Sequence, residues 1–238
     1  MALALLAALA ARTSAETPQG TWPPFLEPPE AFPTDVVVAV EHVWIDPTLS
    51  RTVKGRAAHV PFDLYVVFID TPEVTAAAAR YRKLARYEVQ VLSDDRYRAE
   101  DHEGARGLYR VLVRETNRRV VLSWGEHSGS ILGTIRGSAL TVLDLVPRAG
   151  AVDQRLTAYV RIDNAVAAAL ARLFILIFGS IADQKLAEGF SVTAKVAEWA
   201  NERPDEFCEW LVREPLAPER RERLLSVLPG CRSLTSDR

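Results

Sequence analysis

The chain has 238 residues, of which 48% are hydrophobic and 25% are charged, and its formal net charge at pH 7 is -2. This composition is typical of a folded globular protein, because chains that are disordered throughout are more charged and less apolar. The small net charge gives no general attraction to phosphate backbones, so nucleic acid is not an expected partner.

The N-terminus carries an apolar run that resembles a secretion signal. Ala2 to Ala11 consists only of Ala and Leu, and Thr13-Ser14-Ala15 supplies the small residues that signal peptidases accept. No Lys or Arg precedes the run, however, and an Ala/Leu run is equally a good helix. Two interpretations stay open: residues 1–15 are a signal peptide of a secreted or periplasmic protein, or the protein is cytoplasmic.

Residues 16–33 form a proline-rich linker that excludes a continuous helix or a central strand. Its aromatic residues Trp22, Phe25 and Phe32 either pack onto the domain surface or belong to an extended mobile spacer. A short helix is expected within residues 34–50, with Thr34 or Asp35 as its N-cap.

A strand is expected over residues 52–60, followed by two short helices over residues 62–70 and 71–84. The first helix begins after Pro61 and has a helix-spaced apolar stripe. The second has Thr71 as its expected N-cap and Pro72 in its first turn.

A long β section follows. Strands are expected over residues 87–91, 108–115, 119–130 and 152–162, and a pair of strand segments within 131–146, while 94–104 is predicted to be an acidic, solvated loop. Residues 116–118 are expected to form a hairpin turn in which Asn117 can take the left-handed conformation, and glycines 125, 129, 133 and 137 to mark bends in the sheet. Because short turns connect these strands, the sheet should be antiparallel.

A long helix is expected from its cap at Asn164 to about Asn201. Its first half is apolar almost all round but is too short to span a bilayer and has Arg172 at its middle, so we expect no transmembrane span. Such a helix must be covered, and the concave face of the sheet is large enough to cover it. Two short amphipathic helices, residues 205–213 and 218–228, complete the chain, and whether Cys208 and Cys231 pair is left open.

The order of these elements resembles the START-like superfamily of helix-grip domains, which includes lipid-transfer domains and polyketide cyclases. The matching passages are Val60-Pro61-Phe62-Asp63-Leu64-Tyr65, Ile69-Asp70-Thr71-Pro72, and the strand Leu156 to Ile162 that leads into the terminal helix. The resemblance implies an α+β fold with a hydrophobic or amphipathic ligand between helix and sheet, and it carries over no catalytic residue. We therefore expect a helix-grip domain over residues 51–201, preceded by an N-terminal helix at 34–50 and followed by a helical tail at 202–238.

No catalytic motif or cofactor signature stands out. Glu126 and His127 are neighbours on an expected strand and so face opposite sides. His102 lies in an acidic loop that could bind a metal, but a metal site needs three or four convergent ligands, and a solvated loop is the preferred interpretation. We therefore assign no catalytic residue, metal or cofactor.

The residues expected to line a cavity come from the sheet and from the terminal helix: Trp124, Leu140, Leu143, Arg172, Leu173, Phe174, Ile177 and Phe178. Trp124 and Arg172 are the polar members that would orient a ligand. The competing interpretation is that the apolar members simply fill a core.

Three functions follow from this sequence. The first is a carrier of a lipid-like or polycyclic small molecule. The second is an enzyme of the cyclase or dehydratase kind that uses Glu126, His127 or Asp144 inside the cavity. The third is an interaction module, which a large exposed apolar patch on residues 205–228 would favour.

Overall fold

The structure is a computed structural model that describes residues 20–129, 133–164, 190–228 and 231. The expected signal segment, residues 1–15, and the first half of the expected terminal helix lie outside the described residues.

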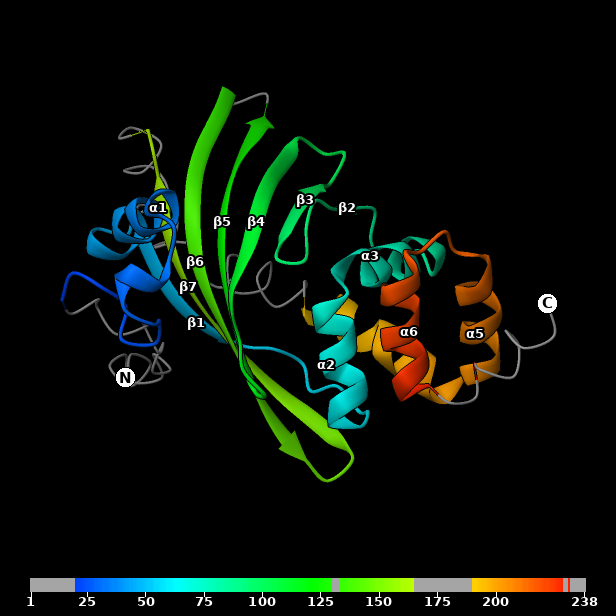
Figure 1. The fold of residues 1–238 in the computed structure, drawn as a ribbon. Coiled ribbons are helices and arrows are strands. Elements are labelled where there is room, and N and C mark those ends of the chain that lie inside the picture. The colour runs from blue at the N-terminus through cyan, green and yellow to red at the C-terminus, as the bar shows by residue number, and fades with distance from the viewer. Residues whose placement is uncertain (1–19, 130–132, 165–189, 229–230, 232–238) are drawn as a thin grey trace, which may run out of the picture.

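Seven antiparallel strands form one curved, open sheet in the order β1-β7-β6-β5-β4-β3-β2 (Figure 1). The strands are β1 (Leu49–Lys54), β2 (Glu88–Val91), β3 (Arg96–Glu100), β4 (Ala105–Arg114), β5 (Arg118–Gly129), β6 (Gly133–Arg148) and β7 (Ala151–Ile162). This confirms the α+β class and the curved antiparallel sheet, an arrangement consistent with a helix-grip fold.

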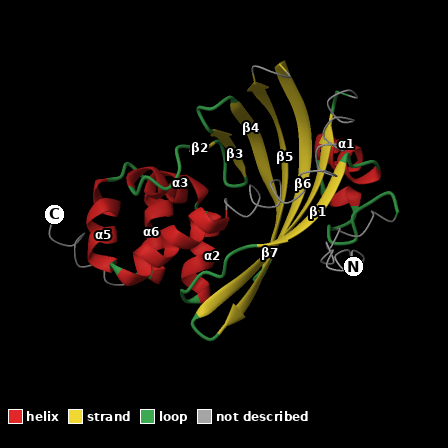
Figure 2. Ribbon diagram, turned by 180° about the vertical axis from the view of Figure 1, so that it is seen from behind, coloured by secondary structure: helices red, strands yellow, loops and turns green. Residues whose placement is uncertain are grey.

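Helices lie on both sides of this sheet. The short 3-10 helix η1 (Pro29–Ala31) and α1 (Thr34–Ile45) lie against the convex face (Figures 1 and 2). On the other side are α2 (Phe62–Asp70), α3 (Pro72–Tyr81), a helical stretch over residues 190–202, α5 (Pro204–Arg213) and α6 (Pro218–Val227).

Two apolar cores lie on opposite faces of the sheet. On the convex face, Leu140 and Val142 of β6 pack with Val40 and Trp44 of α1. On the other face, Leu143 and Leu145 of the same strand join α2, α3, α5, α6 and residues 190–202. Because successive side chains of a strand point to opposite faces of the sheet, β6 contributes residues to both cores.

The proline-rich segment takes the first of its two interpretations over the residues described. Trp22, Phe25 and Phe32 pack against the convex-face core. The Phe25 ring lies 5.5 Å from that of Trp44, and Trp44 lies 4.8 Å from Tyr159 on β7, both edge to face. These rings hold α1 on the sheet.

The C-terminal helices belong to the other core. Phe207 of α5 packs edge to face on Phe68 of α2, at 5.6 Å between ring centroids. Cys208 and Cys231, whose pairing the sequence left open, form a disulfide with 5.0 Å between their Cα atoms. The disulfide closes the chain around α6.

Several local expectations were wrong. β1 ends at Lys54, and Ala58 makes only an isolated bridge to Val152, because the chain leaves the sheet edge before Pro61. Asn117 does not have a positive φ. The expected loop 94–104 contains β3, which its pairing with β4 stabilises despite the exposed charges.

The helix caps also differ. Pro33 occupies the N-cap position of α1, and Thr71 caps α3 without a side-chain hydrogen bond. The Thr71 hydroxyl instead donates to the carbonyl oxygen of Val67 at 2.7 Å. Neither α1 nor α3 therefore begins with a side-chain N-cap hydrogen bond.

Candidate functional site

A row of glycines crosses the middle of the sheet. Gly107 on β4 pairs with Gly125 on β5, which pairs with Gly137 on β6. A Cβ atom at Gly125 would lie 2.7 Å from the carbonyl oxygen of Arg106, and one at Gly137 would lie 2.5 Å from that of Arg161. The strands can approach this closely only because these residues lack side chains.

The glycine row forms the floor of a hollow on the concave face, with a volume of about 470 Å³. Ala99 and Ala139 extend the floor, and the apolar side chains of Ile135, Val160 and Ile162 line one end. Since small residues form the floor and larger apolar residues the end, the surface of the hollow is mostly apolar. It suits a molecule that buries hydrocarbon.

The polar residues that line the hollow include two tyrosines, a serine and a histidine, beside Glu100, Asp101, Arg106, Glu126, Arg136 and Ser138. Tyr87 and Tyr109 line it on the side of β2 and β4, Ser123 lies on the floor, and His127 lies toward the rim. The Ser123 hydroxyl is directed to the carbonyl oxygen of Ala139 at 3.4 Å. Burial raises the pKa of both Tyr87 and Tyr109, so their phenols are uncharged near neutral pH.

The structure separates the three cavity residues that the sequence assigned to the sheet. Leu140 is fully buried in the core beneath α1, whereas Leu143 belongs to the core on the other face. Trp124 borders the hollow, is 39% exposed and also borders a second depression that includes Arg98 and Arg136. These three side chains therefore do not converge on one space.

The remaining expected cavity residues, Arg172, Leu173, Phe174, Ile177 and Phe178, lie outside the described residues. Their assignment to the site stays a prediction.

Candidate acid and base groups are divided between the two faces of the sheet. Glu126 accepts hydrogen bonds from Arg106 and Arg136, which lower its pKa, and Asp144 accepts one from Arg118 at 2.7 Å. His127 pairs with Ile135, which also lines the hollow. Glu126 and His127 thus point to opposite sides of β5, as expected.

His102 has two acidic neighbours. Its Nε2 lies 3.6 Å from a carboxylate oxygen of Glu88, and its Nδ1 lies 4.0 Å from one of Glu100. All three residues are exposed, which is the usual condition of a solvated surface cluster.

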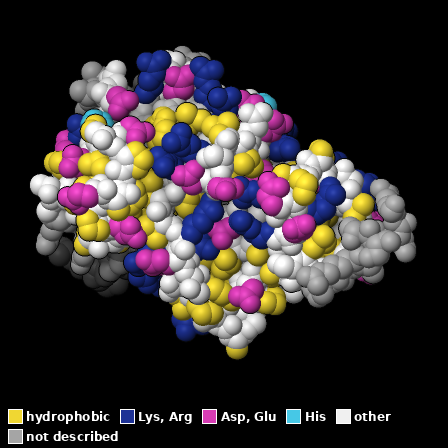
Figure 3. Space-filling model, viewed as in Figure 1, with side chains coloured by type: hydrophobic (Ala, Val, Ile, Leu, Met, Phe, Trp, Pro, Cys, Tyr) yellow, Lys and Arg dark blue, Asp and Glu magenta, His cyan; other side chains and the backbone are white. Residues whose placement is uncertain are grey.

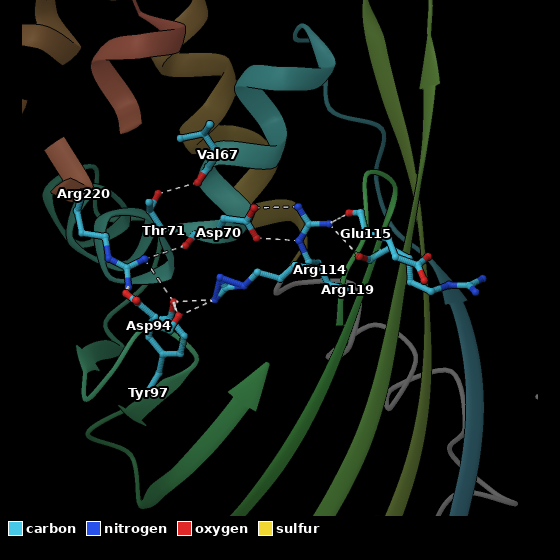
Figure 4. A network of polar contacts seen from close by, with 10 residues as sticks. Val67, Asp70, Thr71, Asp94, Tyr97, Arg114, Glu115, Arg119 and Arg220 are labelled. Atoms are coloured by element: carbon cyan, nitrogen blue, oxygen red, sulfur yellow. Dashed lines mark hydrogen bonds and ion pairs between the residues drawn. The ribbon is translucent and has the colours of Figure 1, made fainter. Parts of the chain in front are cut away.

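A buried polar network lies between the sheet and the helices (Figure 4). Arg119 at the start of β5 binds both carboxylate oxygens of Asp70 at the end of α2, at 2.7 and 2.8 Å. Arg220 of α6 reaches the network from the other side, with its guanidinium 5.9 Å from the centroid of the Tyr97 ring. Tyr97 in turn stacks on Tyr109 of the hollow, at 4.9 Å and 12° between the rings.

The floor and the phenols of the hollow were missed by sequence reasoning. The spacing of glycines 125, 129, 133 and 137 is symmetric about residue 131, so a hairpin centred there pairs Gly125 with Gly137 and Gly129 with Gly133. That signal was present in the sequence. The positions of Gly107, Tyr87 and Tyr109 depend on the register between β4 and β5 and on the packing of α3, which no local pattern reports.

Among the described residues, no helix is both long and apolar enough to cross a membrane. On the face shown in Figure 3, basic and acidic side chains intermingle, with apolar side chains visible between them.

No protein-family model and no curated protein matches the sequence. Solved structures do resemble the fold. A conserved protein from Geobacillus kaustophilus aligns with a TM-score of 0.50 and 15% identity, covering 64% of this chain and 97% of that one. The protein TTHA0849 from Thermus thermophilus aligns with a TM-score of 0.43 and 14% identity, covering 63% and 98%.

A weaker likeness is to a protein of the dynemicin biosynthetic locus, with a TM-score of 0.34 and 13% identity, covering 58% of this chain and 48% of that one. At these identities the likeness concerns the fold alone.

Proposed function

We propose that this protein binds a hydrophobic or amphipathic small molecule, lipid-like or polycyclic, in the hollow on the concave face of the sheet. The observation that carries the proposal is an apolar space of about 470 Å³ whose floor is the row Gly107, Gly125 and Gly137. Small-molecule sites are mostly apolar clefts of roughly 300–1,000 Å³ with a few placed polar groups. The hollow has both properties.

The resemblance to the START-like superfamily supports the same function, since those domains hold apolar ligands against a curved sheet. The contribution of Leu173, Phe174, Ile177 and Phe178 from the terminal helix is part of this proposal.

The cyclase or dehydratase alternative needs an acid or base that is free to act inside the hollow. Asp144 and Glu126 both point to the convex face, where Arg118 binds Asp144, and Arg106 and Arg136 bind Glu126. Only His127 of the three candidates lines the hollow without such a pairing among the described residues. Ligand binding without chemistry is therefore the better-supported proposal.

The interaction-module alternative has less support. Phe207, Trp210 and Leu211 of α5 are buried in the core, and none of the described residues between 205 and 228 is an exposed large hydrophobic. The apolar patch that would have favoured docking is thus internal.

Two adjacent residues of β6 give a matched test of the binding face. Both residues border the hollow, but alternation along β6 points the Ala139 side chain into it and the Ser138 side chain to the convex face, where Ser138 pairs with Trp124 and borders the second depression. Ala139→Phe places a large side chain in the hollow, so we expect it to weaken binding of the fluorescent probe 1-anilinonaphthalene-8-sulfonate about tenfold, since overpacking costs about 1–3 kcal/mol. Ser138→Phe adds the same side chain on the other face and should leave binding unchanged.

Probe titration by fluorescence measures both variants, and circular dichroism checks that both remain folded. Extraction of the purified protein with organic solvent, followed by mass spectrometry, identifies a co-purified ligand. Equal probe binding in wild type, Ala139→Phe and Ser138→Phe would refute the proposed site.

A further inference from the structure

The hollow is lined by two tyrosines whose hydroxyl groups have no hydrogen-bond partner among the described residues. Tyr87 and Tyr109 both line it, and neither hydroxyl makes a hydrogen bond to any other described residue. Partly desolvated polar groups are costly unless they are paired. The two hydroxyls, like the imidazole of His127, are therefore polar groups of this mostly apolar surface that no described residue binds and that remain open to a ligand.

Both phenols act as donors over the physiological pH range. Burial is the largest cause of the raised pKa of Tyr109, and the neighbouring Tyr97, Glu73 and Tyr87 raise it further. Burial likewise raises the pKa of Tyr87. An uncharged phenol donates its O–H to an oxygen acceptor.

Tyr109 is also held in place by Tyr97, the residue it pairs with on the neighbouring strand β3. The Tyr97 ring stacks on it at 4.9 Å, and Tyr97 is fully buried. The Tyr97 hydroxyl donates to the carbonyl oxygen of Asp94 at 3.1 Å and accepts a hydrogen bond from Arg114 at 3.1 Å (Figure 4). A donor on a ring fixed in this way loses little freedom when it binds.

Cationic groups near the hollow are already bound. Arg106 and Arg136 lie at its edge, but both donate to the Glu126 carboxylate, at 2.8 and 3.0 Å, and Glu126 points to the convex face. Arg80 acts to lower the pKa of Tyr87, and Arg114 that of Tyr109, but neither arginine is among the residues that line the hollow. Each of these two donates to a backbone carbonyl oxygen, at 3.0 and 2.8 Å. The polar end of the hollow therefore suits a neutral oxygen better than a carboxylate or phosphate.

We infer that the ligand is an apolar molecule bearing a carbonyl oxygen, such as a ketone, quinone or ester, and that Tyr87 and Tyr109 are its specificity-determining residues. This inference rests on the proposed function and names the ligand class of the same site. The carbonyl oxygen accepts hydrogen bonds from the phenols while the hydrocarbon lies over the glycine floor.

The test compares two probes of nearly the same size and shape, 2-acetylnaphthalene and 2-ethylnaphthalene, which differ in the carbonyl oxygen. Their affinities are measured by displacement of 1-anilinonaphthalene-8-sulfonate. Wild type should prefer the ketone by about two- to tenfold, the range that one or two neutral hydrogen bonds give.

Tyr109→Phe and Tyr87→Phe each remove a hydroxyl and retain the ring. Each should reduce the preference for the ketone and leave the affinity for 2-ethylnaphthalene unchanged. Tyr81→Phe is the matched control, because Tyr81 is 53% exposed and lies outside the hollow, stacked on Trp199. It should retain the full preference of wild type.

The outcomes separate the inference from the proposed function. Equal affinities for both probes in wild type, or a preference that survives in both hollow variants, would overturn the carbonyl inference while leaving apolar binding intact. Failure of both naphthalenes and of the displaced probe to bind the folded wild-type protein would overturn both.

Discussion

Removing the carboxylate of Asp70 should destabilise the protein far more than removing that of a surface acid with similar ion-pair geometry. Asp70 and Arg119 have side chains that are 17% and 7% exposed, and two charge-assisted hydrogen bonds join them. Asp70→Ala leaves the Arg119 guanidinium buried without its counter-ion. Breaking a buried pair in this way costs about 3–5 kcal/mol.

The geometry places the expected loss near the lower end of that range. Arg119 retains its hydrogen bond to the carbonyl oxygen of Arg118 at 2.8 Å and one to that of Glu115, so the guanidinium stays partly satisfied. Asp70 also lies at the C-terminus of α2, where removing a negative charge gains about 0.3–1 kcal/mol. We therefore expect Asp70→Ala to lower the free energy of unfolding by about 3 kcal/mol.

The matched control is Asp153→Ala. Asp153 accepts a hydrogen bond from Arg148 at 2.9 Å, but the two side chains are 50% and 63% exposed. Exposed pairs contribute about 0–1 kcal/mol, because water replaces the lost partner. Urea denaturation at 25 °C, followed by tryptophan fluorescence, measures both variants. Losses within about 0.5 kcal/mol of each other would refute the reasoning that burial decides the cost.

Three further predictions concern stability. Replacing both Cys208 and Cys231 by Ala should lower the free energy of unfolding by about 3 kcal/mol, since the disulfide spans 23 residues; a loss below about 1 kcal/mol by urea denaturation would contradict this. Burial raises the pKa of Glu73 in the folded state above its ordinary value of 4.5. Between 4.5 and the raised pKa the folded state holds a proton that the unfolded state has lost, so the free energy of unfolding should fall as pH rises between these two values. Glu73→Gln should abolish that fall. Hydrogen bonds from Arg56 and His59 lower the pKa of Glu198, so the free energy of unfolding should also fall as pH drops below 4.5, and Glu198→Gln should remove that fall. Denaturation over a pH series measures both effects, and a variant that keeps the pH dependence of wild type in its interval would contradict the prediction for that residue.

The site could be predicted only in part. The alternation along Glu126 and His127 was enough to place them on opposite faces, and the structure has them so. The same alternation applied to Leu140 and Leu143 would have separated those two residues as well, because three residues apart on a strand means opposite faces. Grouping them in one cavity overlooked that α1 covers the second face of the sheet.

Local patterns in the sequence determined most elements of the fold. Helix-spaced apolar residues and prolines at helix starts placed α1, α2, α3, α5 and α6, and alternation with short turns placed β4 to β7. These signals are enough to place the elements because each depends only on residues close to one another along the chain.

The tertiary structure decided what depends on contacts between distant segments. β3 is a strand because it pairs with β4, although its own residues are mostly polar. The floor of the hollow exists because the strand register brings Gly107, Gly125 and Gly137 side by side. Tyr97 stacks beside Tyr109 because β3 pairs with β4 in the register that places these two residues opposite each other. Register and the choice of buried face are set by the sum of many weak contacts across the sheet, and no single stretch of sequence contains them.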